Sequence, residues 1–322
     1  MARHAAIDVG SNSIRLLIAE VDGCGRRTTV HEDREVVRLG TGVFRDGRLE
    51  PSATEAALAA LERMSFAVRS RRVSSARAVG TSALRDAANQ STFVRHATAL
   101  LGLPLEVIDG VEEARLVHLG VRDAVPHPDE RLVIVDLGGG SAQLILSDHG
   151  LPLDAVSLPV GAVRLTEQFG CADRPPESVL ADVQRHVRDH LDRVAHWLPG
   201  EIDRVIATSG TARTIVSVVH ALERTDRRRA DGLTASTREM AGVLEALAGS
   251  SVEERQCVTG VGRRRAAVLP AGLAVLHEIV TGLGVRTFQY SAAGLVDGIV
   301  SDLARGSHTG HAHADTWAAL PR

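Results

Sequence analysis

Two short hairpins stand out in the pattern of apolar and polar positions along the chain. Apolar residues at 5–7 and 14–18 flank a polar turn that contains glycine, and residues 132–135 and 144–146 flank a second turn of the same kind. Short apolar runs bounded by glycine and polar residues are typical of β-strands. Each of the two segments therefore predicts a strand, a tight turn and a second strand.

Helical spacing of apolar residues dominates much of the remaining chain. Residues 51–71 form the strongest case, because Leu58, Leu61, Met64 and Val68 recur at helical spacing after Ser52. Further helices are expected at 89–101, from 109, at 161–169, 176–197, from 212, and at 237–248, 264–280 and 293–303. Further strands are expected at 28–39, 77–80, 105–108, 204–207 and 286–290. Strands followed by helices thus occur twice.

This double pattern predicts an α/β fold with two similar lobes and a cleft between them. A chain of 322 residues, 44% of them hydrophobic, has the length for two buried cores. The expected division is a first lobe at 1–118, a second at 119–306 and a flexible tail at 307–322. His308, His311 and His313 lie in that tail, where a frayed terminus is the simpler interpretation than a metal site.

The two predicted turns share their chemistry as well as their position. Residues 8–13 and 136–141 both read Asp, any residue, Gly, two further residues, then Ser. Glycine lets backbone N–H groups approach an anion, and the serine hydroxyl adds a donor. Since Asp8 and Asp136 would repel a phosphate on their own, their natural partner is a hard divalent cation such as Mg²⁺. One such turn would be ordinary, but recurrence at matched offsets favours a phosphate and metal site.

Composition excludes several classes of function. The chain contains no lysine, so a Schiff base, a lysine base and a Walker-type loop are ruled out. Aromatic residues make up only 2%, which leaves little for stacking on nucleic acid. Cys24, Cys171 and Cys257 are isolated and suggest neither disulfides nor a thiolate metal site, which fits a cytoplasmic protein. No apolar run is long enough to span a membrane.

Three further segments carry candidate chemistry. Arg85 follows the strand expected at 77–80, and ligands of α/β sheets bind at the carboxyl ends of strands. Asp109 and Glu112 match a capping box, which leaves Glu113 as the leading candidate for a catalytic carboxylate. Residues 208–211 form a hydroxyl-rich turn before a helix, where an anion site and an ordinary turn are equally good interpretations. The arginine runs at 69–72, 227–229 and 263–265 are interpreted mostly as solvated faces.

With these residues in view, the chain resembles the exopolyphosphatase and guanosine pentaphosphate phosphohydrolase (Ppx/GppA) family, within the actin, hexokinase and Hsp70 ATPase superfamily. The resemblance runs from residue 5 to about residue 303 and rests on seven ordered segments. These are AIDVGSNSIRLLIA, VVRLGTG, GTSALRDA, IDGVEEARL, IVDLGGGSAQLIL, LPVGAVRLTE and ATSGTA. It implies two ribonuclease-H-like lobes of the actin-like ATPase type.

The resemblance also implies roles for particular residues. Glu113 is expected to be the general base, and Mg²⁺, with Mn²⁺ as an alternative ion, is expected beside Asp8, Asp136 and Gln143. The expected contacts to substrate phosphate are Ser11, Asn12, Arg85, Gly138, Gly139, Gly140, Ser141, Gly210 and Thr211. Two segments depart from the family pattern, which usually has glutamate at position 143 and Leu-Arg-Glu-Gly where this chain has Leu-Val-Asp-Gly at 295–298. Gln143 is expected to weaken metal binding or to change the preferred ion.

The favoured function is metal-dependent release of terminal phosphate from inorganic polyphosphate, with pppGpp as a further candidate substrate. The resemblance is to the short, two-domain form of the family and implies a homodimer. A protein that binds polyphosphate or ppGpp-type nucleotides as a sensor, with little or no catalysis, is the main alternative. A small-molecule kinase and an actin-like filament former are weaker ones. No segment separates polyphosphate from pppGpp or simple nucleoside triphosphates as the preferred substrate.

Overall fold

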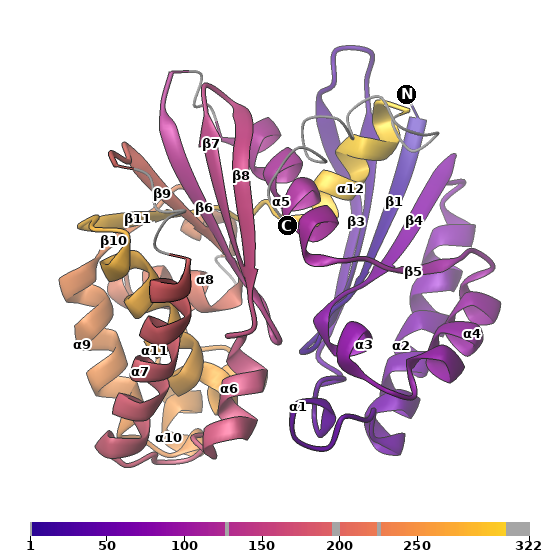
Figure 1. Cartoon of the computed structure of the whole chain (residues 1–322). Helices are drawn as coiled ribbons and strands as arrows, with labels where there is room; N and C mark the ends of the chain where they lie inside the picture. Colours follow the sequence, from indigo (N-terminus) through magenta and orange to yellow (C-terminus); the bar gives the residue numbers. More distant parts are fainter. Residues whose placement is uncertain (1, 126–128, 195–199, 224–226, 307–322) are drawn as a thin grey trace. The chain divides into compact units, whose positions relative to one another are not determined.

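The computed structural model describes residues 2–125, 129–194, 200–223 and 227–306. The chain forms two compact units, one from Met1–Pro126 with Ala293–Arg322 and one from His127–Ala292 (Figure 1). This division corrects the predicted boundary at residue 118, and it assigns the C-terminal helix to the first unit instead of the second. The predicted tail, with His308, His311 and His313, lies outside the described residues.

The first unit is built on a five-stranded sheet in the order β3-β2-β1-β4-β5. Its strands are β1 (Ala2–Val9), β2 (Ile14–Val21), β3 (Arg27–Glu35), β4 (Ser75–Gly80) and β5 (Leu105–Val107). Strand β2 pairs antiparallel with both β1 and β3, and β4 and β5 continue the sheet parallel to β1. Its helices are α1 (Val43–Asp46), α2 (Pro51–Ser70), α3 (Ser82–Asp86), α4 (Gln90–Leu101), α5 (Gly110–Ala124) and α12 (Leu295–Ala304).

Both faces of this sheet are covered by helices. Ala5, Ile7 and Val9 alternate along β1 and share a buried core with Leu61 of α2 and Phe93 of α4. Helices α5 and α12 pack together on the other face, and α12 also contacts β1 and β2 (Figure 1). Because successive side chains of a strand point to opposite faces, Asp8 lies on the face of α5 and α12.

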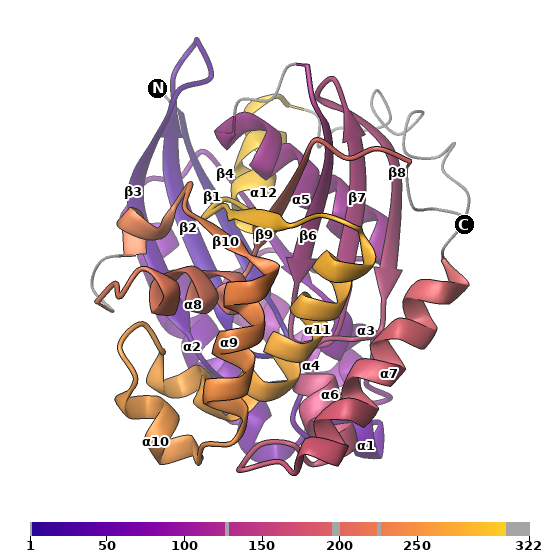
Figure 2. The ribbon, with the colours of Figure 1, turned by 90° about the vertical axis from the view of Figure 1, so that its left-hand side faces the viewer.

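The second unit contains a six-stranded sheet in the order β10-β11-β9-β6-β7-β8. Its strands are β6 (Arg131–Leu137), β7 (Ala142–Asp148), β8 (Leu151–Leu158), β9 (Arg204–Thr208), β10 (Thr234–Ser236) and β11 (Thr287–Tyr290). Its helices are α6 (Ala162–Phe169), α7 (Glu177–Arg193), α8 (Gly210–Val219), α9 (Thr237–Ala248), α10 (Val252–Cys257) and α11 (Leu269–Gly282), with 3-10 turns η2 (Arg227–Ala230) and η3 (Arg263–Val268). Figure 2 shows α7, α8, α9 and α11 gathered over one face of this sheet, where they share its apolar core.

The two sheets have the same topology around their first hairpin. In each unit a strand pairs antiparallel with the next one, which pairs antiparallel with a third. On its other side the first strand pairs parallel with a later strand, β4 in one unit and β9 in the other. This repeated arrangement confirms the predicted α/β fold with two ribonuclease-H-like units. The cleft between the lobes stays a prediction.

Several predicted boundaries differ from the structure for local reasons. The helix expected at 264–280 is divided into η3 and α11, because Pro270 has no N–H to donate and so stands in the first turn of α11. The strand expected at 28–39 ends at Glu35. Helix α7 ends at Arg193, and part of the predicted extension to 197 lies outside the described residues. The sequence pattern missed α1, α3, β8, β10 and α10.

A close contact between α5 and α12 explains why the last helix belongs to the first unit. A side chain at Gly120 would overlap the carbonyl of Gly294, and one at Gly298 would overlap the carbonyl of Leu116. The absence of side chains at these positions therefore lets the two helix backbones touch. The altered family segment lies here, and the Asp297 carboxylate accepts from the Gly294 amide at 2.9 Å and pairs with Arg27. Within the described residues, no helix has the length and apolar character needed to cross a membrane.

Candidate functional site

The two repeated turns have the same backbone conformation. The Gly10 amide donates to the Ser13 carbonyl at 3.2 Å, and the Gly138 amide donates to the Ser141 carbonyl at 2.9 Å. A Cβ at either glycine would lie 3.1 Å from the carbonyl oxygen of the matching serine. The aspartates also occupy equal positions, since each stands two residues before its glycine at the end of a first strand. The matched offsets in the sequence therefore correspond to a matched structure.

The turn of the first unit is held from three sides and leaves one polar side chain unsatisfied. The Ser11 hydroxyl accepts from the Ala83 amide at 3.2 Å, and its carbonyl accepts from Gly40 at 2.7 Å. The Asn12 carbonyl accepts from the Arg38 amide. Both the nitrogen and the oxygen of the Asn12 side chain are buried without a hydrogen-bond partner. An unsatisfied buried polar group costs about 1–3 kcal/mol, so a bound ligand is a natural partner for this amide.

The turn of the second unit directs its carbonyl groups toward helix α6. The Gly138 carbonyl accepts from the Ala162 amide at 3.1 Å, and the Gly139 carbonyl accepts from the Val163 amide at 2.7 Å. The Gly140 carbonyl accepts from Nε of Arg164 at 2.7 Å. Because the N–H of a peptide unit points opposite to its C=O, the following amides face away from α6. They form a backbone cradle of the kind that binds anions.

Glu113 and Arg85 form an ion pair at the start of α5. Arg85 Nη1 donates to Glu113 Oε2 at 2.8 Å and to the Ile108 carbonyl at 2.8 Å. Glu113 is only 5% exposed. Arg85 lies on α3, two residues after the Ala83 amide that binds Ser11. The structure therefore brings the predicted base, the predicted arginine and the first turn together within one unit.

Glu112 does not complete the predicted capping box. The Asp109 carboxylate does cap α5 by accepting from the Glu112 amide at 2.8 Å. The Glu112 carboxylate instead accepts from Nε and Nη2 of Arg115 at 2.6 and 2.9 Å, and lies 3.0 Å from Nη2 of Arg77. Two guanidinium groups are stronger partners for a carboxylate than one backbone N–H.

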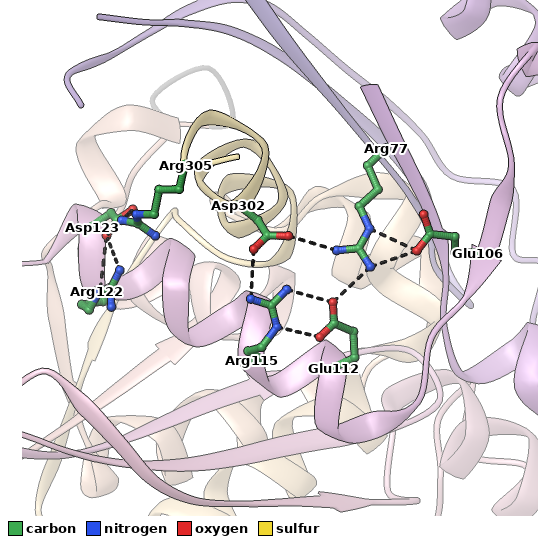
Figure 3. Close-up of polar contacts among 8 residues, drawn as sticks. All are labelled: Arg77, Glu106, Glu112, Arg115, Arg122, Asp123, Asp302 and Arg305. Atoms are coloured by element: carbon green, nitrogen blue, oxygen red, sulfur yellow. Dashed lines mark hydrogen bonds and ion pairs between the residues drawn. The ribbon is translucent and has the colours of Figure 1, made fainter. Parts of the chain in front are cut away.

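These arginines connect the first turn of α5 to the C-terminal helix (Figure 3). Arg115 Nη1 donates to Asp302 Oδ1 at 3.0 Å, and Arg77 Nη1 donates to Asp302 Oδ2 at 3.4 Å. Arg77 also donates to Glu106 on β5. The side chains of Asp302 and Arg77 are 3% and 6% exposed. The network is largely buried and holds the first turn of α5, the turn that also carries Glu113.

A row of polar residues crosses the sheet of the second unit beside its turn. Asp136 pairs with Gln143 on β7 and with Thr208 on β9, and Gln143 pairs with Ser157 on β8. Residues directly opposite each other on neighbouring strands present their side chains on the same face. Gln143 is fully buried and its Oε1 has no hydrogen-bond partner. Asp136 and this Oε1 therefore offer neighbouring oxygen atoms of the kind that Mg²⁺ binds in proteins.

The oxygen atoms available suit a metal held partly by its substrate. Among the described residues, no group of three or more His, Cys, Asp or Glu side chains could hold a metal ion. Mg²⁺ commonly binds proteins through one or two carboxylates and completes its shell with waters and phosphate oxygens. Within the second unit, Asp136 and Gln143 offer oxygen atoms for such a partial shell, and Asp8, which belongs to the first unit, stays a predicted ligand.

The turn at 208–211 contains another unsatisfied polar side chain. Thr211 is fully buried, and its hydroxyl lies beside Gly272 of α11 without a hydrogen-bond partner. Ser209 has φ of 111° and its hydroxyl accepts from the Ala212 amide. The Arg265 guanidinium lies directly over Gly210. Arg265 was missed because the run 263–265 is interpreted as a solvated face, yet only Arg263 and Arg264 are exposed.

Two ribonuclease-H-like units with matching glycine and serine turns define a protein of the actin-like ATPase fold. Residues 17–306 match the Ppx/GppA phosphatase family, and the chain belongs to this family. It is 31% identical over 317 residues to Exopolyphosphatase 2 of Mycobacterium tuberculosis, which covers 94% of this chain and 99% of the relative.

Solved structures agree with this assignment. A crystal structure of an exopolyphosphatase-like protein has a TM-score of 0.90 and 29% identity, and covers 96% of this chain and 99% of that chain. The Aquifex aeolicus member of the Ppx/GppA family has a TM-score of 0.80 and 26% identity, with coverage of 96% and 99%. The similarity therefore extends over both units.

Proposed function

We propose that this protein releases the terminal phosphate of inorganic polyphosphate by metal-dependent hydrolysis, and that pppGpp is a second substrate, converted to ppGpp. The observation that carries the proposal is the pair of Arg85 and Glu113, 2.8 Å apart, in the unit that also presents the unsatisfied Asn12 amide. Membership of a phosphatase family and similarity to an exopolyphosphatase support the same reaction.

Phosphoryl oxygens are bound by donors that the fold holds in place. In the second unit these are the amides of Gly139 and Gly140 with the Ser141 hydroxyl, and in the first unit the Asn12 amide and Arg85. The Arg85 guanidinium has five N–H groups. Only those on Nη1 donate to Glu113 and to the Ile108 carbonyl. Its remaining N–H groups can bind a phosphoryl oxygen while the ion pair persists. Fixed donors of this kind stabilise the charge that develops in phosphoryl transfer.

Glu113 acts as the general base. Its carboxylate orients a water molecule against the terminal phosphorus and takes a proton from it as the P–O bond to the leaving phosphate breaks. Burial and the contact with Arg85 fix the carboxylate in one direction, which favours this step because a misplaced base loses rate steeply. Asp136, with Asp8 and Gln143 Oε1, would hold Mg²⁺, which supplies charge neutralisation when bound.

The test is phosphate release by the purified protein from polyphosphates of several lengths, pppGpp and ATP, each with Mg²⁺ and with Mn²⁺. Glu113→Gln should lower turnover by about a hundredfold to ten-thousandfold and leave substrate binding intact. Glu62→Gln is the matched control, because Glu62 is exposed on α2 of the same unit, away from the ion pairs of α5. Equal turnover in wild type and Glu113→Gln would contradict the assigned base.

A sensor that binds polyphosphate or a ppGpp-type nucleotide without hydrolysing it is the second candidate. It is favoured by Gln143, because a neutral amide replaces the carboxylate that the family usually has beside Asp136. Tight binding of these ligands without phosphate release under either metal would select this candidate. Gln143→Glu should then raise metal-dependent release. The expected homodimer stays a prediction, which sedimentation of the purified protein would test.

A further inference from the structure

The hydroxyl oxygen of the serine in each repeated turn accepts a hydrogen bond from a side chain of the same sheet. In the second unit, Gln143 Nε2 donates to the Ser141 hydroxyl oxygen at 2.9 Å and to the Ser157 hydroxyl oxygen at 3.2 Å. In the first unit, Nε and Nη2 of Arg34 donate to the Ser13 hydroxyl oxygen at 3.3 and 3.1 Å. Ser13 and Ser141 are the equivalent serines of the two turns.

The donors come from equivalent places in the two sheets. In the strand register Asp8 lies opposite Arg15 on the second strand, and Arg15 lies opposite Arg34 on the third. In the other unit Asp136 lies opposite Gln143 on the second strand, and Gln143 lies opposite Ser157 on the third. The same polar row therefore supplies an N–H donor to the turn serine in both units, from the third strand in one case and from the second in the other.

The direction of these hydrogen bonds is determined by the donor groups. An arginine can only donate, so Ser13 must be the acceptor. For Gln143, Nε2 is the atom that faces both serine hydroxyls, and Oε1 is buried without a hydrogen-bond donor. Each serine hydroxyl thus acts as a hydrogen-bond acceptor toward the protein. Neither donates its proton to another residue in the described part of the chain.

We propose that Gln143 is a positioning residue that commits the Ser141 proton to a bound phosphoryl oxygen. This rests on the proposed function of the turns as phosphate-binding elements. A glutamate at position 143 would present two acceptor oxygens to Ser141 and Ser157, and the Ser141 hydroxyl would turn to donate to it. A glutamate at this position would therefore accept the proton that glutamine leaves available. Compared with glutamate, the glutamine amide lets the second turn bind phosphate more strongly when no metal is present. It also removes one negative charge that could bind the metal.

The test is a double-mutant cycle on the full-length protein. Binding of tripolyphosphate is measured by calorimetry with a chelator present, for wild type, Ser141→Ala, Gln143→Glu and the double variant. Ser141→Ala should weaken binding about tenfold or more in the wild-type background, the typical effect of losing a donor to a charged acceptor. In the Gln143→Glu background the same change should cost less than about twofold, because the proton is already taken. Simple repulsion by the new carboxylate would instead give additive effects.

Ser13→Ala is the matched control. Its partner Arg34 is unchanged, so it should weaken binding about tenfold in both backgrounds. Equal effects of Ser141→Ala in both backgrounds would overturn the proposal. So would no effect of Ser141→Ala in the wild-type background, a result that stays decisive if Gln143→Glu fails to fold.

Phosphate release with Mg²⁺, measured on the same proteins, separates this inference from the proposed function. Release by wild type without the coupling between positions 141 and 143 would overturn the role of Gln143 and leave hydrolysis standing. The coupling without release from any substrate would leave the role of Gln143 standing and select the sensor.

Discussion

Arg85 uses a single nitrogen, Nη1, to bind both Glu113 and the carbonyl of Ile108, each at 2.8 Å. The carbonyl lies just before α5, and Glu113 lies in the first turn of that helix. One guanidinium therefore fixes the predicted base relative to the backbone that leads to it. The same group is the predicted phosphate ligand, so a change at Arg85 should affect two steps at once.

Arg85→Ala should lower kcat/KM by about a hundredfold to a thousandfold, with a higher KM as well as a lower kcat. Loss of phosphate contact raises KM, and loss of the contact with Glu113 lowers kcat. Steady-state phosphate release from tripolyphosphate measures both, with Arg95→Ala as a control because Arg95 is exposed on α4 of the same unit. A lower kcat at unchanged KM would limit Arg85 to orienting Glu113. Partial rescue by added guanidinium ion would support a direct role.

The Asp302 carboxylate should matter for activity although it lies on the last described helix. Asp302→Asn weakens two contacts, with Arg77 and Arg115, in a site that is only 3% exposed. We expect a loss of unfolding free energy on the order of 2 kcal/mol and a decrease in kcat, because the Glu112 side of α5 loses its support. Urea unfolding and phosphate release measure the two effects. Asp189→Asn, exposed on α7, is the control.

A loss of stability at unchanged kcat would show that the Asp302 network only stabilises the fold. A change in KM alone would also contradict the prediction, since neither Asp302 nor its arginine partners belong to the proposed phosphate contacts.

Local sequence signals were sufficient for the two hairpins. Apolar runs, glycine and the recurrent Asp and Ser report on neighbouring residues, and the structure shows the same turn twice. The capping signal at Asp109 was also local and is present. The family resemblance supplied the fold of both units, which the sheet topology confirms.

The rest depends on contacts between residues far apart in the sequence. Glu112 pairs with Arg77 because Arg77 arrives from β4, which no spacing within α5 reveals. The assignment of α12 to the first unit depends on bare backbone at Gly120 and Gly298. Arg265 belongs to a run of three arginines, and it is the one whose guanidinium lies over Gly210. The packing of η3 determines which of the three does so. Periodicity and composition carry no information on such contacts.

Gly298→Ala should destabilise the first unit strongly. A methyl group at this position would overlap the Leu116 carbonyl of α5, so α12 must move away. We expect a loss on the order of 3 kcal/mol. Gly242→Ala is the matched control, since it lies in helix α9 with nothing within 4 Å of the added carbon. There the same change should stabilise by about 0.5–1 kcal/mol. Thermal unfolding distinguishes the two, and equal shifts would contradict the close contact.

Arg255 should be the most sensitive arginine of the second unit. Its side chain is fully buried, and burial lowers the pKa of its guanidinium. The group donates to the carbonyls of Leu247, Ala172, Ala266 and Ser250 at 2.6–2.9 Å. These carbonyls belong to different segments, one of them η3, which carries Arg265.

Arg255→Lys keeps a positive charge but has one ammonium group in place of a planar fork, so it cannot reach all four carbonyls. We expect a loss of unfolding free energy on the order of 3 kcal/mol, measured by urea unfolding followed by circular dichroism. Arg263→Lys, exposed on η3, should change stability by less than about 0.5 kcal/mol. Because η3 is held by the lost contacts, the variant should also weaken phosphate binding if Arg265 contributes to it. Full stability of Arg255→Lys would mean that the four carbonyls are satisfied without the guanidinium.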